Sequence, residues 1–552
     1  MIQFDHQVMF ANTTASVRVL ARTDASYSSR INKGELIVEA IVTVYRGYTH
    51  AVITVLRSSP VARDVGRFLT DKLIENEYVP EHNECINGRW QKVWGKWVPK
   101  YKYFRYDEKS QKMYIPIAYC DELVRRLSDC GYHVVIKELA DYETRKIDVH
   151  MKPGVTDQEH QVELIAKCSD PTPGMKGLSM QTGKGKTYAA IKSWVNLGYA
   201  GIVIVKGLMD QWIKSIREFT DCDHDYIYKI QEFNSLALLA QNPQYKPNIF
   251  VASLRTIQIF AEGGYDVLPW SYKEFMTYYG IGTKIVDEVH QAFHTTNSLD
   301  LMTNVKHNLY CSATFTQSGK KAREIFLRVF PLSIQYGRNA YDKYISIIWI
   351  NYYGAVNEKR CVKKRGYMHA KYEHELLISE RKFNDHCREV IIPYIDMYYI
   401  NRYQKGYKAL IFCASINFVE ALVVKLSREY PDKKVISYLG GDSMDVLGSA
   451  DIIVSTTGKS GTGLDVKNLV FAMNTVSGTS EILALQCAGR LRKKEGVDLI
   501  YVDRCDLNIQ AQVRHGEYRK EILRGISSRF FEYNGLTDLS VQTGEVHQFA
   551  TV

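Results

Sequence analysis

The sequence lacks any stretch near the roughly 20 consecutive apolar residues that a membrane-spanning helix needs, which argues against an integral membrane protein. Its first segment, MIQFDHQVMF, also lacks the basic and apolar regions of a secretory signal. The 11 cysteines form no CxxC pair and no Cys/His cluster with zinc spacing, so we expect reduced, mostly buried thiols. Together these absences predict a cytoplasmic protein that makes no membrane contact.

Prolines are scarce, at 13 of 552 residues, and no repeat or low-complexity tract is present, which argues against a disordered or fibrous chain. The hydrophobic content of 45% is that of an ordinary globular protein, and the length corresponds to about three or four domains. Lys and Arg exceed Asp and Glu by 71 to 61, a net charge of +10. This excess permits a polyanionic partner, although a basic surface kept for solubility also explains it.

Changes of pattern along the chain predict four blocks. Residues 1–155 mix alternating, strand-like runs with amphipathic stretches, which predicts a small α+β domain. Residues 156–339 and 340–505 alternate short apolar runs with helical segments, which predicts two α/β lobes on parallel sheets. Residues 506–552 predict a helical tail with a basic and an apolar face.

The segment QTGKGKT has the residues of a phosphate-binding loop. Such a loop needs small residues that let backbone N–H groups face the anion, a lysine for the outer phosphates and a hydroxyl for Mg²⁺. The segment supplies these groups and predicts contacts with ATP from Gly183, Lys184, Gly185, Lys186 and Thr187. Met180 departs from the full pattern, which has Gly or Ala there, and a glycine-rich surface turn is the alternative.

Two adjacent carboxylates follow the apolar run KIV about a hundred residues later. Phosphoryl transfer to water needs one carboxylate for hydrated Mg²⁺ and another that orients or deprotonates the attacking water. We therefore predict that Asp287 lies beside the metal, with Thr187, and that Glu288 is the base. In isolation the pair also fits a solvated acidic turn.

The motifs and their order resemble those of superfamily 2 helicases. DEVH at Asp287–His290, SAT at Ser312–Thr314, IIVSTTGKSGTGLDVKN and QCAGRLRK follow one another as motifs II, III, V and VI do in that family. The resemblance implies two tandem RecA-like lobes that use ATP and Mg²⁺. It also implies that Ser312, Ala313 and Thr314 couple the nucleotide site to a nucleic-acid track.

Further residues of the ATP site follow from the same resemblance. A motor that closes on ATP needs a cation from one lobe to stabilise charge on phosphates held by the other, and Arg490 is the candidate. The family's next arginine falls on Lys493, whereas Arg492 comes one place early, so either side chain fits that role. The remaining candidates for nucleotide contacts are Gln161, Gly463, Asp465 and Gln486.

Single-stranded nucleic acid is held in this family mainly through backbone phosphates, by loops at the strand ends. Residues of this chain that match those loops are Gln211, Ser253, Thr256, Thr457 and Gly461.

The first block narrows the resemblance to the UvsW-type helicases of T-even phages, which place a small domain before the motor. From Arg89 to Tyr106 six Lys or Arg residues interleave with seven aromatic ones, an arrangement suited to phosphate pairing and base stacking. The predicted DNA contacts are Trp94, Lys96, Trp97, Lys100 and Lys102. A half-buried hairpin with its aromatic side inward explains the same pattern equally well.

These residues lead to the prediction of an ATP-dependent DNA helicase or translocase that unwinds or branch-migrates forks and recombination junctions in replication, recombination and repair. The implied partners are branched, single-stranded or duplex DNA and single-strand-binding or recombination proteins. We expect a monomer that acts in the cytoplasm, or in the host cytoplasm if the protein comes from a phage. Three alternatives remain: a duplex translocase without strand separation, an RNA helicase, and a non-enzymatic binding or annealing protein.

Overall fold

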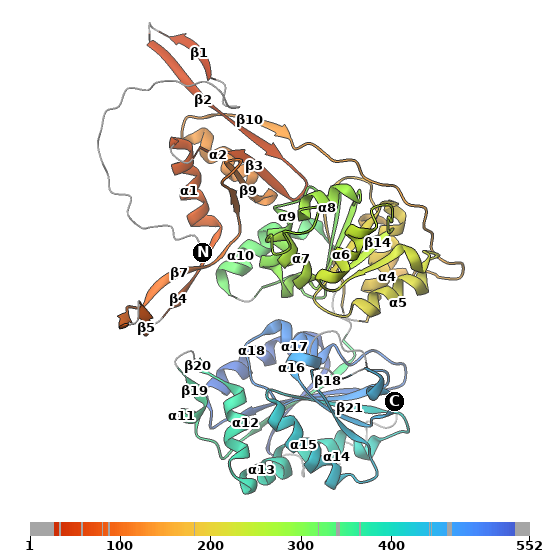
Figure 1. Ribbon diagram of the computed structural model, residues 1–552. Coiled ribbons are helices and arrows are strands. Elements are labelled where there is room, and N and C mark those ends of the chain that lie inside the picture. The colour runs from red at the N-terminus through yellow and green to blue at the C-terminus, as the bar shows by residue number, and fades with distance from the viewer. Residues whose placement is uncertain are drawn as a thin grey trace. The chain divides into compact units, whose positions relative to one another are not determined.

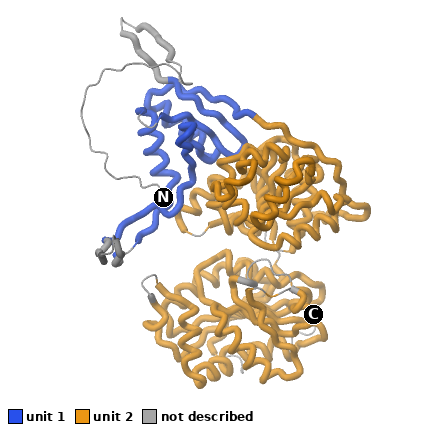
Figure 2. The backbone as a smooth tube through the Cα atoms, viewed as in Figure 1, with its two compact units in different colours: residues 1–140 blue, residues 141–552 orange. Residues whose placement is uncertain are grey.

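The computed structural model describes residues 27–535 except for 33–34, 57–58, 80, 87–88, 182, 318, 338–342, 364–365, 441, 443 and 461–465. The chain divides into two compact units, residues 1–140 and 141–552, shown in blue and orange in Figure 2. No helix among the described residues is long and apolar enough to cross a membrane.

The first unit is built on a mixed sheet with strand order β1-β2-β3-β9-β8, in which β10 pairs parallel with β2. Its strands are β1 (Tyr27–Asn32), β2 (Glu35–Arg46), β3 (His50–Thr54), β8 (Arg105–Asp107), β9 (Lys112–Pro116) and β10 (His133–Glu138). Helices α1 (Pro60–Lys72) and α2 (Cys120–Asp129) pack together on apolar faces that include Phe68 and Leu123. Ser59 caps α1 by accepting a hydrogen bond from the backbone of Ala62.

A segment with two antiparallel strand pairs lies between α1 and β8 in the chain. Strands β4 (Ile74–Val79) and β7 (Lys96–Lys102) pair antiparallel, and β5 (His82–Ile86) and β6 (Arg89–Val93) form a second antiparallel pair between them in the chain. Neither pair is joined to the main sheet among the described residues. We call residues 74–102 the arm.

The second unit begins with lobe 1, whose seven strands run parallel in the order β13-β14-β12-β15-β16-β11-β17. The strands are β11 (Gly174–Ser179), β12 (Gly201–Val205), β13 (Ile227–Ile230), β14 (Ile249–Ser253), β15 (Thr283–Asp287), β16 (His307–Ser312) and β17 (Gln335–Tyr336). The helices are α3 (Glu159–Cys168), α4 (Lys186–Leu197), α5 (Met209–Phe219), α6 (Phe233–Gln241), α7 (Leu254–Ala261), α8 (Tyr272–Tyr278), α9 (Phe293–Asp300) and α10 (Lys320–Val329).

Both faces of the lobe 1 sheet are buried. Along β12, Val203 and Val205 point into one apolar core, whereas Ile202 and Ile204 point into another. A run of apolar residues without polar alternation is what a parallel strand covered on both sides requires. The predicted βαβ pattern of this region is therefore confirmed.

Lobe 2 repeats the arrangement with the parallel order β22-β23-β21-β24-β25-β18-β26. Its strands are β18 (Ile345–Tyr352), β21 (Lys408–Cys413), β22 (Val435–Tyr438), β23 (Ile452–Thr456), β24 (Leu469–Asn474), β25 (Leu499–Asp506) and β26 (Ser527–Asn534), with a small pair β19 (Val362–Lys363) and β20 (Gly366–Tyr367). Its helices are α11 (Glu358–Cys361), α12 (His369–Leu377), α13 (Glu380–His386), α14 (Ile392–Tyr398), α15 (Ile416–Glu429), α16 (Thr457–Ser460), α17 (Glu481–Ala488) and α18 (Gln510–Ile526). Figure 1 shows α14 and α15 on one side of these strands and α17 and α18 on the other.

Two predicted boundaries differ from the structure. The first unit ends at Ala140 rather than at 155, because residues 141–155 pack on lobe 1 through backbone bonds such as Arg145 N–H to Gly280 O and Lys152 N–H to Phe219 O. The predicted helical tail is helical only to Ile526. It then forms β26, which extends the lobe 2 sheet by pairing with β18, so this part of the tail belongs to the lobe.

Candidate nucleotide and nucleic-acid site

The phosphate loop lies between β11 and α4, at the carboxyl edge of the lobe 1 sheet. Gly183 and Gly185 have φ values of 85° and 83°, a region that side-chain-bearing residues rarely adopt. Gly185 is the N-cap of α4, so the first backbone N–H groups of that helix are available to an anion. The loop thus has the backbone geometry that phosphate binding requires.

Lys186, the first residue of α4, lies between the two predicted catalytic carboxylates. Its Nζ is 3.4 Å from Oδ1 of Asp287 and forms a short ion pair with Oε1 of Glu288. Burial opposes the charge of Lys186, but Glu288 and Asp287 outweigh burial and raise the pKa of the ammonium. The lysine is therefore charged and lies where the glycine loop meets the carboxylates predicted to be the base and the metal ligand.

The carboxylates occupy the end of β15. Asp287 is the last residue of the strand, and Glu288 follows with φ 51° and ψ 48°, a strained conformation for a residue other than glycine. Oε2 of Glu288 is buried, and Nδ1 of His290 lies 3.3 Å from it without the geometry of a hydrogen bond. A carboxylate oxygen that is not fully engaged by the protein can accept a hydrogen bond from an attacking water.

Trp212 makes a contact at this site that the sequence did not predict. Its indole Nε1 donates to Oδ2 of Asp287 at 3.0 Å, and the backbone N–H of Glu288 donates to Oδ1 at 3.0 Å. Trp212 is buried on α5, next to Gln211, so it belongs to a segment that the sequence associates with the nucleic-acid track. No local signal distinguishes a tryptophan that orients a carboxylate from one that fills a core.

His290 links motifs II, III and VI. Its Nδ1 lies 2.7 Å from Oγ of Ser312, whose hydroxyl donates to the carbonyl of Thr314 at 2.6 Å. Nε2 lies 3.2 Å from Nε2 of Gln486, on α17 of lobe 2. Because Ser312 already donates its proton, Nδ1 of His290 carries the ring proton and Nε2 accepts from Gln486.

This histidine stays neutral at ordinary pH. Burial, the charge of Lys186 and that of Lys206 lower the pKa of His290 to about 3, against a smaller opposing effect of Asp287. The neutral ring can therefore accept one hydrogen bond and donate another, which an imidazolium cannot do.

Gln161 lies against the phosphate loop. It is buried on α3, and its side chain donates to the carbonyl of Lys184 at 2.9 Å while accepting from the backbone of Gln158 at 3.0 Å. His160 contacts the same carbonyl at 3.1 Å. The glutamine therefore holds the loop, and its predicted contact with the nucleotide stays a prediction.

The structure places the two cationic candidates after α17 differently. Arg492 is half-buried with its guanidinium against Gly183, where a Cβ atom would clash with it, whereas Lys493 is exposed. Of these two, Arg492 is the residue beside the phosphate loop. Arg490 is buried immediately after α17, one turn from Gln486. Gly461, Gly463 and Asp465 lie outside the described residues.

The predicted track residues do not share one environment. Gln211 is exposed, and Ser253 and Thr457 are half-buried at strand ends. Thr256, by contrast, is buried and its hydroxyl donates to the carbonyl of Gln231, so that side chain is committed to the fold instead of to a ligand. The neighbouring Arg255 is exposed and donates to the side chain of Gln258 at 3.2 Å.

Two tryptophans of the arm are exposed to solvent. Trp94 is 72% exposed and Trp97 70% exposed, and Trp97 meets Tyr78 edge to face with ring centroids 5.6 Å apart. Lys96, Lys100 and Lys102 lie on or at the ends of β7, and Lys100 pairs with Glu75 at 3.8 Å. The alternative of an inward aromatic side fails for Trp94 and Trp97, whereas Tyr103 just beyond the arm is buried.

Several solved structures are similar to this chain at low sequence identity. Yeast Dbp5, from S. cerevisiae and bound to RNA and ADP BeF3, matches with 12% identity and a TM-score of 0.49 over 71% of this chain and 93% of its own. T4 UvsW matches with 15% identity and a TM-score of 0.32 over 89% of this chain and 99% of its own. The restriction-modification enzyme LlaBIII bound to DNA matches with 12% identity and a TM-score of 0.46 over 78% and 36%. No family model matches the sequence, and no curated protein sequence does.

Proposed function

We propose that this protein is an ATP-driven DNA helicase or translocase that unwinds or branch-migrates forked and recombination-junction DNA. The observation that carries the ATPase part is the convergence of Lys186, Asp287 and Glu288 beneath a glycine loop at a helix N-terminus. Burial of a lysine between two carboxylates is not expected in a surface turn, because removing these charges from water costs free energy. Such clusters are typical of sites that bind a ligand or catalyse a reaction.

The residues divide the hydrolysis of ATP between them. The phosphates would accept hydrogen bonds from the loop and from Lys186, which exchanges Glu288 for a phosphate oxygen. Glu288, so released, orients the attacking water and takes its proton. Thr187 and Asp287 would hold Mg²⁺, which neutralises phosphate charge when bound, and Trp212 keeps Asp287 in place. Arg490 and Arg492 supply positive charge from lobe 2.

Two contacts of His290, with Gln486 and with Ser312, support coupling between ATP hydrolysis and lobe movement. They connect the residue beside the base with the helix that precedes Arg490 and with motif III. A change at the phosphates can therefore alter lobe 2 through hydrogen bonds rather than through the backbone alone. Lobes that open and close on a strand gripped by its phosphates produce translocation.

The arm supports a nucleic-acid partner. Its exposed indoles and the lysines of β7 match the stacking surface and phosphate contacts of single-strand binding. A fork or junction supplies unpaired bases next to duplex, which is why we favour branched DNA over uninterrupted duplex.

The experiment is steady-state ATP hydrolysis by the full chain without nucleic acid and with single strands, duplexes and forks of DNA and matched RNA. We expect forked DNA to stimulate turnover, and Lys186→Ala and Glu288→Gln to abolish it. Lys192→Ala is the matched control, because this lysine lies on the same helix but pairs with Asp157 outside the site. Turnover that persists in Lys186→Ala would refute the proposal.

The same substrates separate the alternatives. Greater stimulation by RNA forks identifies an RNA helicase, and triplex displacement without fork unwinding identifies a duplex translocase. Nucleic-acid binding or annealing without ATP turnover identifies a non-enzymatic protein. Failure on every branched substrate rules out the junction-specific role.

A further inference from the structure

A buried arginine in lobe 2 lies outside every motif that sequence reasoning singled out. Arg519, on α18, is only 2% exposed, and each N–H group of its guanidinium finds an acceptor. Nε and Nη2 donate to the two carboxylate oxygens of Asp503 at 3.2 and 3.0 Å, and Nη2 also donates to the carbonyl of Arg504 at 3.1 Å. Nη1 donates to Oγ of Ser477 at 3.2 Å and to the carbonyl of Gly478 at 3.3 Å.

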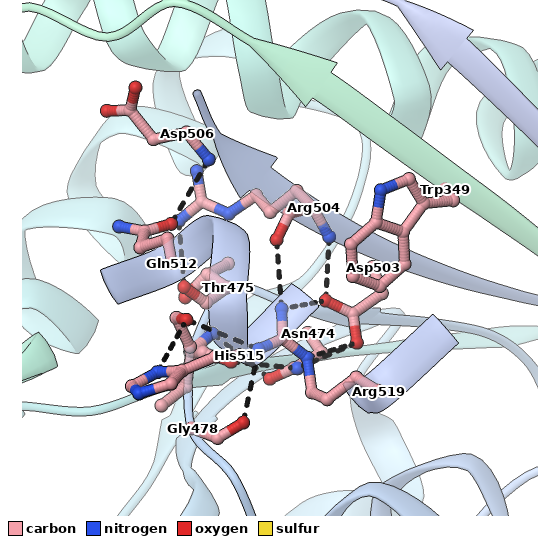
Figure 3. A network of polar contacts seen from close by, with 12 residues as sticks. Trp349, Asn474, Thr475, Gly478, Asp503, Arg504, Asp506, Gln512, His515 and Arg519 are labelled. Atoms are coloured by element: carbon pink, nitrogen blue, oxygen red, sulfur yellow. Dashed lines mark hydrogen bonds and ion pairs between the residues drawn. The ribbon is translucent and has the colours of Figure 1, made fainter. Parts of the chain in front are cut away.

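Asp503, on β25, is equally well satisfied although its exposure is 0%. Besides Arg519 it accepts from the side chain of Asn474 at 3.2 Å and from the backbone of Arg504 at 2.7 Å. Figure 3 shows Arg519 reaching from its helix between this carboxylate and the segment around Gly478, beside Trp349.

A buried ion pair of this kind is weak as a source of stability. Removing two charges from water costs about as much as their attraction returns, and well-packed apolar side chains often stabilise a core as well. An arginine whose five donors are all used in one geometry instead imposes that geometry on its acceptors.

Two of the acceptors, Ser477 and Gly478, belong to the loop that leads into motif VI. This loop, residues 475–480, joins β24 to α17, and Arg519 binds it at Ser477 and Gly478. A second buried arginine, Arg504, donates to the carbonyl of Thr475 at 3.2 Å. The loop is thus fixed along its length before α17 begins.

Helix α17 carries the contacts that reach the ATP site. Gln486 on this helix meets His290 at 3.2 Å, and Arg490 follows its last turn. α17 also packs against α18, the helix that bears Arg519. A shift of the loop would therefore move both Gln486 and Arg490.

We propose that Arg519, through Asp503 and the loop 475–480, is a positioning residue that sets the place of α17 and hence of Gln486 and Arg490 in the ATPase site. The inference rests on the proposed function, because it assigns Arg519 to the turnover of ATP. Lysine at this position keeps the charge but has one nitrogen, and it cannot hold Asp503, Ser477 and Gly478 together.

The test is the DNA-stimulated kcat and KM for ATP of Arg519→Lys in the full chain. We expect kcat to fall about 100-fold, the scale of a misplacement of catalytic groups by about 1 Å, with little change in KM. Ser477→Ala removes a single acceptor and should lower kcat by a smaller factor. Ser477→Ala provides the test if the Arg519→Lys variant does not fold.

Lys408→Met is the matched control for a buried cation. Lys408 is 8% exposed and donates to the carbonyls of Gly448 and Ala450, but at the amino end of β21, the opposite edge of the same sheet. We expect a comparable loss of thermal stability and an unchanged kcat. An equal fall of kcat in this variant would show that Arg519 acts only through stability.

A double variant separates positioning from folding directly. If Arg519 acts through Arg490, then Arg519→Lys should lower kcat little further in an Arg490→Ala background. Full additivity, or a wild-type kcat in both Arg519→Lys and Ser477→Ala, would overturn the inference. Failure of the proposed function is distinct, because it appears as absence of DNA-stimulated turnover in the unsubstituted chain.

Discussion

At the scale of single residues, the candidate site depends on hydrogen bonds that no motif specifies. Asp287 and Glu288 are recognisable from their place after a strand, but their orientation comes from Trp212 and from the left-handed backbone at Glu288. Side chains of this supporting kind commonly change metal affinity or activity by 10- to 100-fold when removed.

Replacing Trp212 with Phe tests this support. The ring that fills the core is kept while the donor to Asp287 is lost, so we expect kcat for ATP to fall by roughly 10- to 100-fold and more Mg²⁺ to be needed for half-maximal turnover. Turnover measured against Mg²⁺ concentration checks this expectation. Trp194→Phe is the control, because its indole donates to the carbonyl of Tyr199 instead. Equal effects of both changes would contradict the assignment.

Buried histidines predict how stability depends on pH. Burial and the charges of Lys176, Lys306 and Lys146 lower the pKa of His307 to about 4, from an ordinary value of about 6.5. Below pH of about 6.5 the unfolded chain gains a proton that the folded chain does not bind. His307 therefore contributes stability that is fully present above pH 6.5 and is lost as the pH falls toward 4.

The corresponding variant is His307→Phe, which keeps a flat ring against Tyr199 and removes the titration. We expect the free energy of unfolding to fall less steeply between pH 6.5 and 5 than in the unsubstituted chain, by at most about 1.4 kcal/mol per pH unit. Urea unfolding at several pH values measures the slope. A substitution of the exposed His224 is the control. An unchanged slope in His307→Phe would contradict the prediction.

At the scale of elements, we expect the arm to contribute to DNA binding separately from ATP hydrolysis. Because Trp94 and Trp97 are exposed and three lysines lie along β7, we expect Trp97→Ala to weaken the binding of forked DNA by about 1–3 kcal/mol for each stacked base lost. ATP hydrolysis without DNA should be unchanged. Fluorescence anisotropy at fixed salt measures the affinity.

Tyr353→Ala provides the comparison for that measurement. Tyr353 is 75% exposed but lies in lobe 2, just after β18, so its loss should leave the affinity unaltered. Equal weakening by both substitutions, or none by Trp97→Ala, would mean that the arm does not stack bases.

At the scale of the whole molecule, ATP and DNA should act on one equilibrium between lobe arrangements. The contact of Gln486 with His290 joins the lobes at the proposed ATP site. Thermodynamic linkage then requires that an ATP analogue tighten DNA binding by the same factor by which DNA tightens binding of the analogue. We expect a factor of about 5 to 150, and a smaller one in Gln486→Ala.

Binding measured in both directions under one buffer checks this expectation. Lys408→Met, distant from the contact, should keep the full factor. A factor of one in the unsubstituted chain would show that the two ligands bind independently.

Those parts of the fold and of the candidate site that have local signals were predictable from the amino-acid sequence. The two parallel-sheet lobes follow from the alternation of apolar runs and amphipathic helices, and the phosphate loop and the carboxylate pair follow from residue type at strand ends. The boundary at Ala140 and the final strand β26 were not predictable in this way, because each is decided by pairing with distant backbone.

Contacts between side chains of different elements depend on the three-dimensional packing. Trp212 reaches Asp287, Arg492 rather than Lys493 lies against Gly183, and Thr256 turns inward, each through a contact between segments far apart in the chain. The same holds for Arg519 and Asp503, which sit on different elements and converge on a third. Local pattern fixes the type of element and its exposed side, but partners across elements are set by packing, which a sequence pattern does not encode.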